Sequence, residues 1–228
     1  MKRLILPLFT VLTLVSCAAR IESSLAADGS AAVNVSMSLE PRMASLIRSF
    51  SRAGGQTTGP VLDAPAITQS MSRAPGVASV NFRNTSDSAL EGQVRISHIN
   101  NFLSANGFSF INFQQNGRCV INININNGPV ICSLLSQEIT GYLEALMAPI
   151  ATGERLTKSQ YLDEVAMFYN RAVSDEIAGS RIIVSIDFPG VITNVRGGTY
   201  SGRRANFDIA LLDLLVLETP LTYEVTWN

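Results

Sequence analysis

The sequence has little of the material from which metal, nucleotide and nucleic-acid sites are usually built. Its 228 residues include one histidine and three cysteines, so few metal-ligating side chains are available. Only 15% of the residues are charged, and 17 Lys and Arg are balanced by 18 Asp and Glu. A large basic surface is therefore excluded, and we expect no nucleic-acid partner, no metal and no cofactor. The 46% of hydrophobic residues are enough to bury the core of one domain.

The motifs of common enzyme classes are also missing. The run closest to Gly-x-Ser-x-Gly is Gly198 to Gly202, and it places Ser201 one position late. Lys158 lies in no glycine-rich phosphate loop, and a single histidine excludes His-Glu-x-x-His. His98 follows an apolar strand face without a nucleophile motif, so we interpret it as structural. The sequence predicts a protein that is not an enzyme, although carboxylates assembled in space leave no sequence signature.

The N-terminus has the features of a secretory signal. Lys2 and Arg3 precede an apolar run, residues 4–15, that is too short to span a bilayer. The run ends in Leu14-Val15-Ser16-Cys17, which resembles the lipobox of bacterial lipoproteins. That resemblance implies cleavage of residues 1–16, a diacylglycerol on Cys17 and acyl chains as the membrane anchor.

The predicted mature chain is weakly acidic and has no second anchor. Cleavage removes Lys2 and Arg3, which leaves 15 basic and 18 acidic residues and a net charge of −3. No later stretch approaches 18 uninterrupted apolar residues, so lipid alone is expected to hold the protein at the membrane of the cell envelope. Ala18 follows the predicted lipidated cysteine, where an aspartate would suggest retention in the inner membrane. The absence of aspartate weakly favours the outer membrane, and the leaflet stays open.

A hairpin is predicted directly after the anchor. Residues 21–26 suit an extended strand, Asp28-Gly29 is a two-residue hairpin signal, and residues 31–39 alternate strictly between apolar and polar. We therefore predict a lipidated N-terminus and short tether over residues 17–19 and one domain over residues 20–228. The alternative is a flexible linker over residues 18–30.

Helices and strands follow in groups. An amphipathic helix begins at Pro41, a surface excursion over 54–76 includes a short helix near 67–71, and strands 108–114 and 118–126 turn at Asn116-Gly117. One helix begins at Pro129 and another at Thr157, where Gln160 completes a capping box. The apolar stripe of the latter is Tyr161, Leu162, Val165, Phe168, Tyr169 and Ala172. With further strands near the C-terminus, the pattern predicts an α+β fold, an antiparallel sheet of hairpins with helices grouped on one face.

Two segments near the C-terminus are candidate ligand sites. Ala210 to Leu217 is the most apolar stretch of the mature chain. It is either a buried core segment, the lining of a ligand cavity or a membrane-facing patch, and for a cavity that holds acyl chains the lining residues would be Leu211, Leu214 and Leu215. Arg196, Arg203 and Arg204 flank Gly197-Gly198. They suit either an anionic headgroup or a solvated hairpin.

The two cysteines that remain beside Cys17 allow one disulfide. Cys119 faces the core by alternation, and Cys132 lies in the first turns of the next predicted helix. In an oxidising compartment they form either a bridge or two separate buried thiols.

The C-terminal part resembles a known family. Phe188-Pro189-Gly190-Val191-Ile192, the turn at Gly197-Gly198 and the closing strand Tyr223 to Trp227 resemble the C-terminal half of the LppM-type domain of bacterial lipoproteins. The resemblance implies a membrane-tethered α+β domain associated with envelope lipids or glycolipids. The leading hypothesis is a binding or structural lipoprotein; the alternatives are an enzyme with an unrecognised site and a surface adhesin or antigen.

Overall fold

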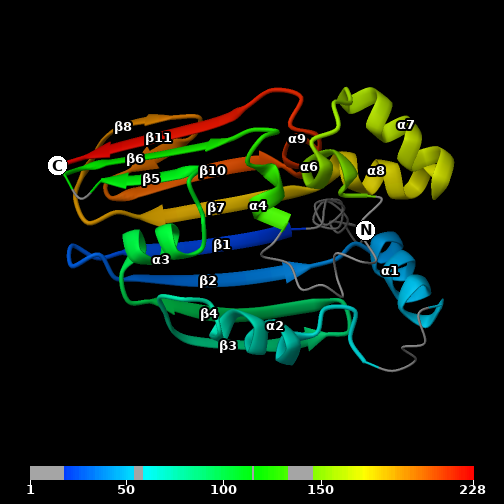
Figure 1. Cartoon of the computed structure of the whole chain (residues 1–228), viewed down its shortest axis with the longest axis horizontal. Coiled ribbons are helices and arrows are strands. Elements are labelled where there is room, and N and C mark those ends of the chain that lie inside the picture. Colours follow the sequence, from blue (N-terminus) through cyan, green and yellow to red (C-terminus); the bar gives the residue numbers. More distant parts are fainter. Residues whose placement is uncertain (1–17, 54–58, 115, 133–145) are drawn as a thin grey trace, which may run out of the picture.

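The computed structural model describes residues 18–53, 59–114, 116–132 and 146–228, which form two β-sheets and several helices (Figure 1). The larger sheet has seven strands in the order β3-β4-β2-β1-β7-β10-β9, and the smaller has four in the order β5-β6-β11-β8. The predicted α+β class is confirmed. The architecture differs from one antiparallel sheet, because β1 and β7 pair in parallel and join two antiparallel halves.

Pairs and runs of strands are separated by helices along the chain. The strands are β1 (Ala18–Leu25), β2 (Ala31–Ser38), β3 (Val77–Ser86), β4 (Ala89–Ile96), β5 (Ile111–Gln114), β6 (Arg118–Ile123), β7 (Arg181–Asp187), β8 (Ile192–Arg196), β9 (Thr199–Ser201), β10 (Arg204–Ala210) and β11 (Leu221–Trp227). The helices are α1 (Pro41–Ala53), α2 (Ala64–Ser72), α3 (Ile99–Ala105), α4 (Gly128–Cys132), α6 (Ala148–Thr152), α7 (Lys158–Phe168), α8 (Arg171–Gly179) and α9 (Leu211–Val216).

The first hairpin lies at the centre of the larger sheet. Its turn is fixed by Asp28, whose carboxylate accepts from the backbone N–H of Ser30 at 2.9 Å and from its hydroxyl at 2.7 Å, while Gly29 takes a φ of +85°. The hairpin prediction is confirmed. The strand begins earlier than predicted, because Ala18 and Ala19 pair with Arg181 and Ile182 of β7.

The main core lies between the smaller sheet and the half of the larger sheet that contains β7 and β10. Inward residues of β7 and β10 meet inward residues of the smaller sheet. Trp227 stands at the centre, with its ring centroid 5.5 Å from that of Phe113 and 4.8 Å from that of Phe188. On the other half of the larger sheet, α2 and α3 cover the apolar face of β3, β4 and β2. All of this packing is on one face of the larger sheet.

The segment after Thr157 forms two helices where the sequence pattern predicted one. The capping box is confirmed, since the Thr157 hydroxyl accepts from the Gln160 N–H at 3.2 Å and the Gln160 side chain accepts from the Thr157 N–H at 2.9 Å. Helix α7 ends at Phe168, and the Asn170 side chain caps α8 by accepting from the Val173 N–H at 3.0 Å. Phe168, which the predicted apolar stripe includes, is the last residue of α7, and its side chain is 72% exposed.

Other predicted elements fall partly outside the described residues. The short helix near 67–71 is confirmed as part of α2, and the hairpin of β5 and β6 is confirmed, with Gly117 at a φ of +101°. The helix predicted from Pro129 begins as α4. Its predicted continuation over residues 133–145 lies outside the described part of the chain, as do the predicted signal peptide and Cys17.

Candidate functional site

The outer face of the larger sheet, on the side away from the helices and the smaller sheet, is polar. Strand alternation places two cross-strand rows there. One runs Arg83, Glu91, Ser36 and Arg20 from β3 to β1, and the next runs Asn81, Gln93, Asn34 and Glu22 over the same four strands. The opposite positions of these strands, such as Val33, Val80 and Val94, pack inward.

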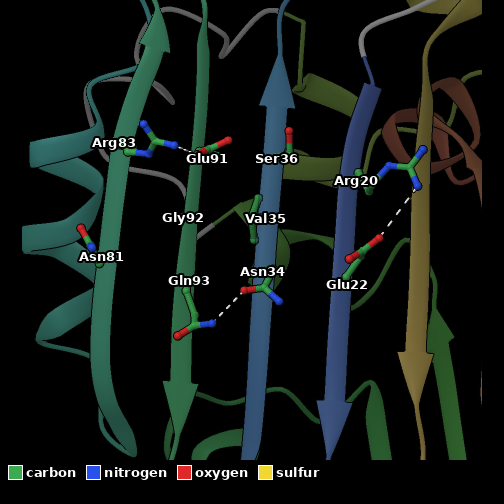
Figure 2. A pocket seen from close by; sticks show the side chains of 10 residues that line it. All are labelled: Arg20, Glu22, Asn34, Val35, Ser36, Asn81, Arg83, Glu91, Gly92 and Gln93. Carbon is green, nitrogen blue, oxygen red and sulfur yellow. Dashed lines mark hydrogen bonds and ion pairs between the residues drawn. The ribbon is translucent and has the colours of Figure 1, made fainter.

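These two rows surround a shallow hollow of about 370 Å³ (Figure 2). Its lining residues are Arg20, Glu22, Asn34, Val35, Ser36, Asn81, Arg83, Glu91, Gly92 and Gln93. Gly92 is on the floor between Glu91 and Gln93. A Cβ atom there would lie 2.4 Å from Cδ1 of Phe82 and 2.5 Å from the carbonyl oxygen of Asn81, so only glycine fits beside the Phe82 ring.

Hydrogen bonds hold several of the lining side chains. The Gln93 amide donates to Oδ1 of Asn34 at 2.9 Å and accepts from Nε of Arg95 at 3.0 Å. Arg83 donates to Glu91 across the strand pair. Nη1 of Arg20 and Oε1 of Glu22 are 3.9 Å apart, beyond hydrogen-bond distance, so these two side chains keep polar atoms available to a ligand.

The charges of the hollow cancel. Two arginines and two glutamates line it, each arginine faces a glutamate, and all four side chains are at least 43% exposed. An ion would gain little from such a surface. A neutral molecule with many hydroxyl groups fits it better, because amide, carboxylate and guanidinium groups donate to and accept from hydroxyls.

The leucines proposed as a cavity lining are on α9. Leu214 and Leu215 pack against the core between the sheets, and Leu212 and Leu215 also pack against a second cluster made by α7 and α8. Asp213, the polar residue of this run, pairs with Lys158 at the start of α7. Leu211, Leu214 and Leu215 are half-buried and lie apart from the polar hollow, so their role in acyl binding stays a prediction.

Four other candidate side chains are not assembled into a site. Arg203 donates to the carbonyl of Phe188 at 2.8 Å, while Arg204 pairs with Asp187 on the outer face at 2.6 Å. Arg196 is on β8, in the smaller sheet. His98 is exposed at the start of α3, where its side chain makes no cap.

Cys119 is buried as a free thiol, and desolvation raises its pKa to about 12, so it is unreactive at neutral pH. The side chain of Cys132 lies outside what the structure describes, so the choice between a Cys119–Cys132 bridge and two separate thiols stays open.

Within the described ranges, no group of three or more His, Cys, Asp or Glu side chains is arranged to hold a metal ion. In the same part of the chain, no helix is long and apolar enough to cross a membrane.

The hollow was missed in the sequence because its residues come from four strands. The alternation that predicted the strands also placed Asn34 and Ser36 on a polar face. The order β3-β4-β2-β1, which brings the polar positions together, has no comparable signal in the sequence.

The fold is similar to that of a solved domain from another protein. The folded domain of the LppM protein of Mycobacterium tuberculosis, determined by NMR, matches with a TM-score of 0.42 and 9% sequence identity. The match covers 94% of this chain and 90% of that domain. No family model and no curated protein matches the sequence.

Proposed function

We propose that this chain is a lipid-anchored protein of the cell envelope whose domain binds the polar headgroup of a glycolipid in the hollow on the outer face. The position of the hollow carries the proposal. Arg20 is two residues from the start of β1 at Ala18, a distance of about 7 Å along a strand. Cys17, the predicted site of lipid attachment, immediately precedes Ala18, so the hollow would lie beside the headgroups of the anchoring leaflet.

The chemistry of the hollow favours sugars over charged headgroups. Its four charged side chains cancel in pairs, while Asn34, Asn81 and Gln93 supply side-chain amides that both donate and accept. Such an open surface gives weak, selective binding of one headgroup, since it buries less of a ligand than a closed cleft.

Binding is favoured over catalysis for the same surface. Catalytic carboxylates are usually desolvated and brought close to a second reacting group. Glu22 and Glu91 are 45% and 43% exposed, and each faces an arginine. They are suited to hydrogen bonding with a ligand.

The headgroup proposal is tested with the soluble chain 18–228 and short-chain glucosyl, galactosyl and mannosyl glycerides below their micellar concentrations. NMR signals of the Asn34, Asn81 and Gln93 side-chain amides are expected to shift saturably with at least one glyceride. In the double variant Asn34→Ala/Asn81→Ala, the remaining Gln93 side-chain amide should no longer shift. The control Asp208→Ala, on the same face but on β10, should keep these shifts.

Two outcomes would count against the proposal. Shifts confined to the methyl groups of Leu211, Leu214 and Leu215 would move the ligand to α9. Shifts that also occur with inorganic phosphate alone would identify an anion site.

The anchor is tested separately in cells. Radiolabelled palmitate is expected to enter the wild-type protein and to be absent from Cys17→Ser. Label that persists in the variant would exclude Cys17 as the lipidated residue.

A further inference from the structure

Two large apolar side chains project into solvent at the turn between α7 and α8. Met167 and Phe168 are both 72% exposed, although apolar side chains of this size are usually covered. They are adjacent, and the helix break at Asn170 fixes them at the end of α7. We call this pair the α7 tip.

The α7 tip is at the end of the molecule where the chain enters the sheet. The start of β1 lies between the end of β2 and the start of β7. Strand β2 ends at Ser38, three residues before α1, and β7 begins at Arg181, two residues after α8. Helices α1, α7 and α8 are therefore grouped at the end from which β1 starts (Figure 1).

Helix α1 is fixed beside the α7 tip. The Phe50 ring of α1 packs edge-on against Tyr169, with centroids 6.0 Å apart. At the other end of α1, the Glu176 carboxylate of α8 accepts from the N–H groups of Arg42 and Met43 at 3.0 and 2.9 Å. These contacts hold the exposed Arg52 in the last turn of α1 and the exposed Arg171 at the start of α8 close to the tip.

We propose that the α7 tip inserts into the bilayer that carries the anchor, so that α1, α7 and α8 rest on the membrane and the strands point away from it. The inference rests on the proposed anchoring at Cys17, which places the membrane one residue before Ala18. Exposed methionine and phenylalanine side chains partition into the boundary between headgroups and acyl chains.

The charged neighbours set the depth of the contact. Arg52 can reach phosphate groups while its alkyl stem lies along the interface, and Arg171 can do the same when its exposed ion pair with Asp175 opens. Asp163 and Glu164 are one helical turn before Met167 and Phe168, about 6 Å back along α7. They remain in water when only the tip enters, so the tip orients the domain and the acyl chains supply the affinity.

This orientation would also determine where the hollow lies relative to the membrane. With the helical end on the membrane, the rows from Arg83 to Arg20 and from Asn81 to Glu22 lie on the strands above the helices that touch the leaflet, and the row that ends at Arg20 is the nearer one. A glycolipid of the same leaflet could then be bound without leaving the bilayer.

The test uses the full lipidated chain in vesicles of phosphatidylethanolamine and phosphatidylglycerol whose acyl chains are brominated, with unbrominated vesicles as reference. Phe168→Trp places a reporter at the tip. Val191→Trp is the matched control, because Val191 is 61% exposed and follows β7 at the far end of the sheet. Trp227 is buried in both variants, and its emission is subtracted by using the wild type.

A blue shift and loss of Phe168→Trp emission in brominated vesicles, with Val191→Trp unaffected, is the expected result. Unquenched Phe168→Trp overturns the docking, and equal quenching of both reporters overturns the orientation. Retention on the vesicles is measured by flotation. An unquenched chain that floats leaves the anchor at Cys17 intact, whereas an unquenched chain that does not float overturns both proposals.

Discussion

Replacing Gly92 by alanine should destabilise the domain and deform the hollow together. Gly92 is paired with Phe82 on β3 and Val35 on β2. A Cβ atom would lie 2.4 Å from Cδ1 of Phe82 and 2.5 Å from the backbone oxygen of Asn81, well inside ordinary contact. The ring can rotate, but the oxygen belongs to the backbone of β3, so β3 must move away from β4.

The size of the effect follows from two opposing contributions. Overpacking costs about 1–3 kcal/mol. Alanine recovers about 0.5–1 kcal/mol, because it loses less backbone entropy than glycine on folding. We therefore expect Gly92→Ala to lower the free energy of unfolding by about 1–2 kcal/mol. Gly179→Ala is the matched control: nothing lies within 4 Å of its Cβ position at the end of α8, and the change should be neutral or stabilising by up to about 1 kcal/mol.

Urea unfolding of the chain 18–228, followed by circular dichroism, measures both free energies. The Gly92→Ala variant should also bind the glycerides more weakly than Gly179→Ala, since Asn81 and Arg83 move with β3. If Gly92→Ala were as stable as the wild type, or if both variants changed stability in the same direction, the close packing of Phe82 over Gly92 would be wrong.

Three further predictions concern single groups. Glu176→Ala removes the two hydrogen bonds that hold the first turn of α1 and should lower the free energy of unfolding in urea by about 2 kcal/mol. The control Asp175→Ala breaks an exposed ion pair with Arg171 and should lower it by less than about 0.5 kcal/mol, so equal losses in the two variants would contradict the capping role of Glu176. Hydrogen bonding to Arg204 holds the pKa of the Asp187 carboxyl below its ordinary value of 3.8, so the stability that this ion pair contributes is present above pH 3.8 and is lost as the pH falls through the folded-state pKa. In Arg204→Ala, NMR titration of the Asp187 carboxyl should give a pKa closer to 3.8, and an unchanged pKa would refute the pairing. In the Cys132→Ser variant the Cys119 thiol should resist a thiol reagent at neutral pH and react fully in denaturant, and rapid reaction of the folded protein would show that the thiol is not buried.

Local features of this fold were readable from the sequence because their causes are local. Asp28 and Gly29 predict the first hairpin, since an aspartate side chain and a glycine with positive φ are what the turn requires. Thr157 and Gln160 predict the start of α7 because both partners of the capping box are three residues apart. Alternation of apolar residues predicts which face of each strand is buried. The break between α7 and α8 also had a local signal, the capping side chain of Asn170, which the continuous apolar stripe concealed.

The candidate sites depended on contacts between residues far apart in the chain, and these only the tertiary structure decided. Parallel pairing of Ala18 with Arg181 joins the two halves of the larger sheet across more than 160 residues and fixes which strands surround the hollow. Glu176 caps a helix that begins 135 residues earlier. The sequence predicts lipid attachment at Cys17, which stays a prediction, and the α+β class, which the structure confirms. The polar hollow and the α7 tip depend on strand order and helix placement. Both are determined by the packing energy of the whole core, and no single segment of the sequence contains that information.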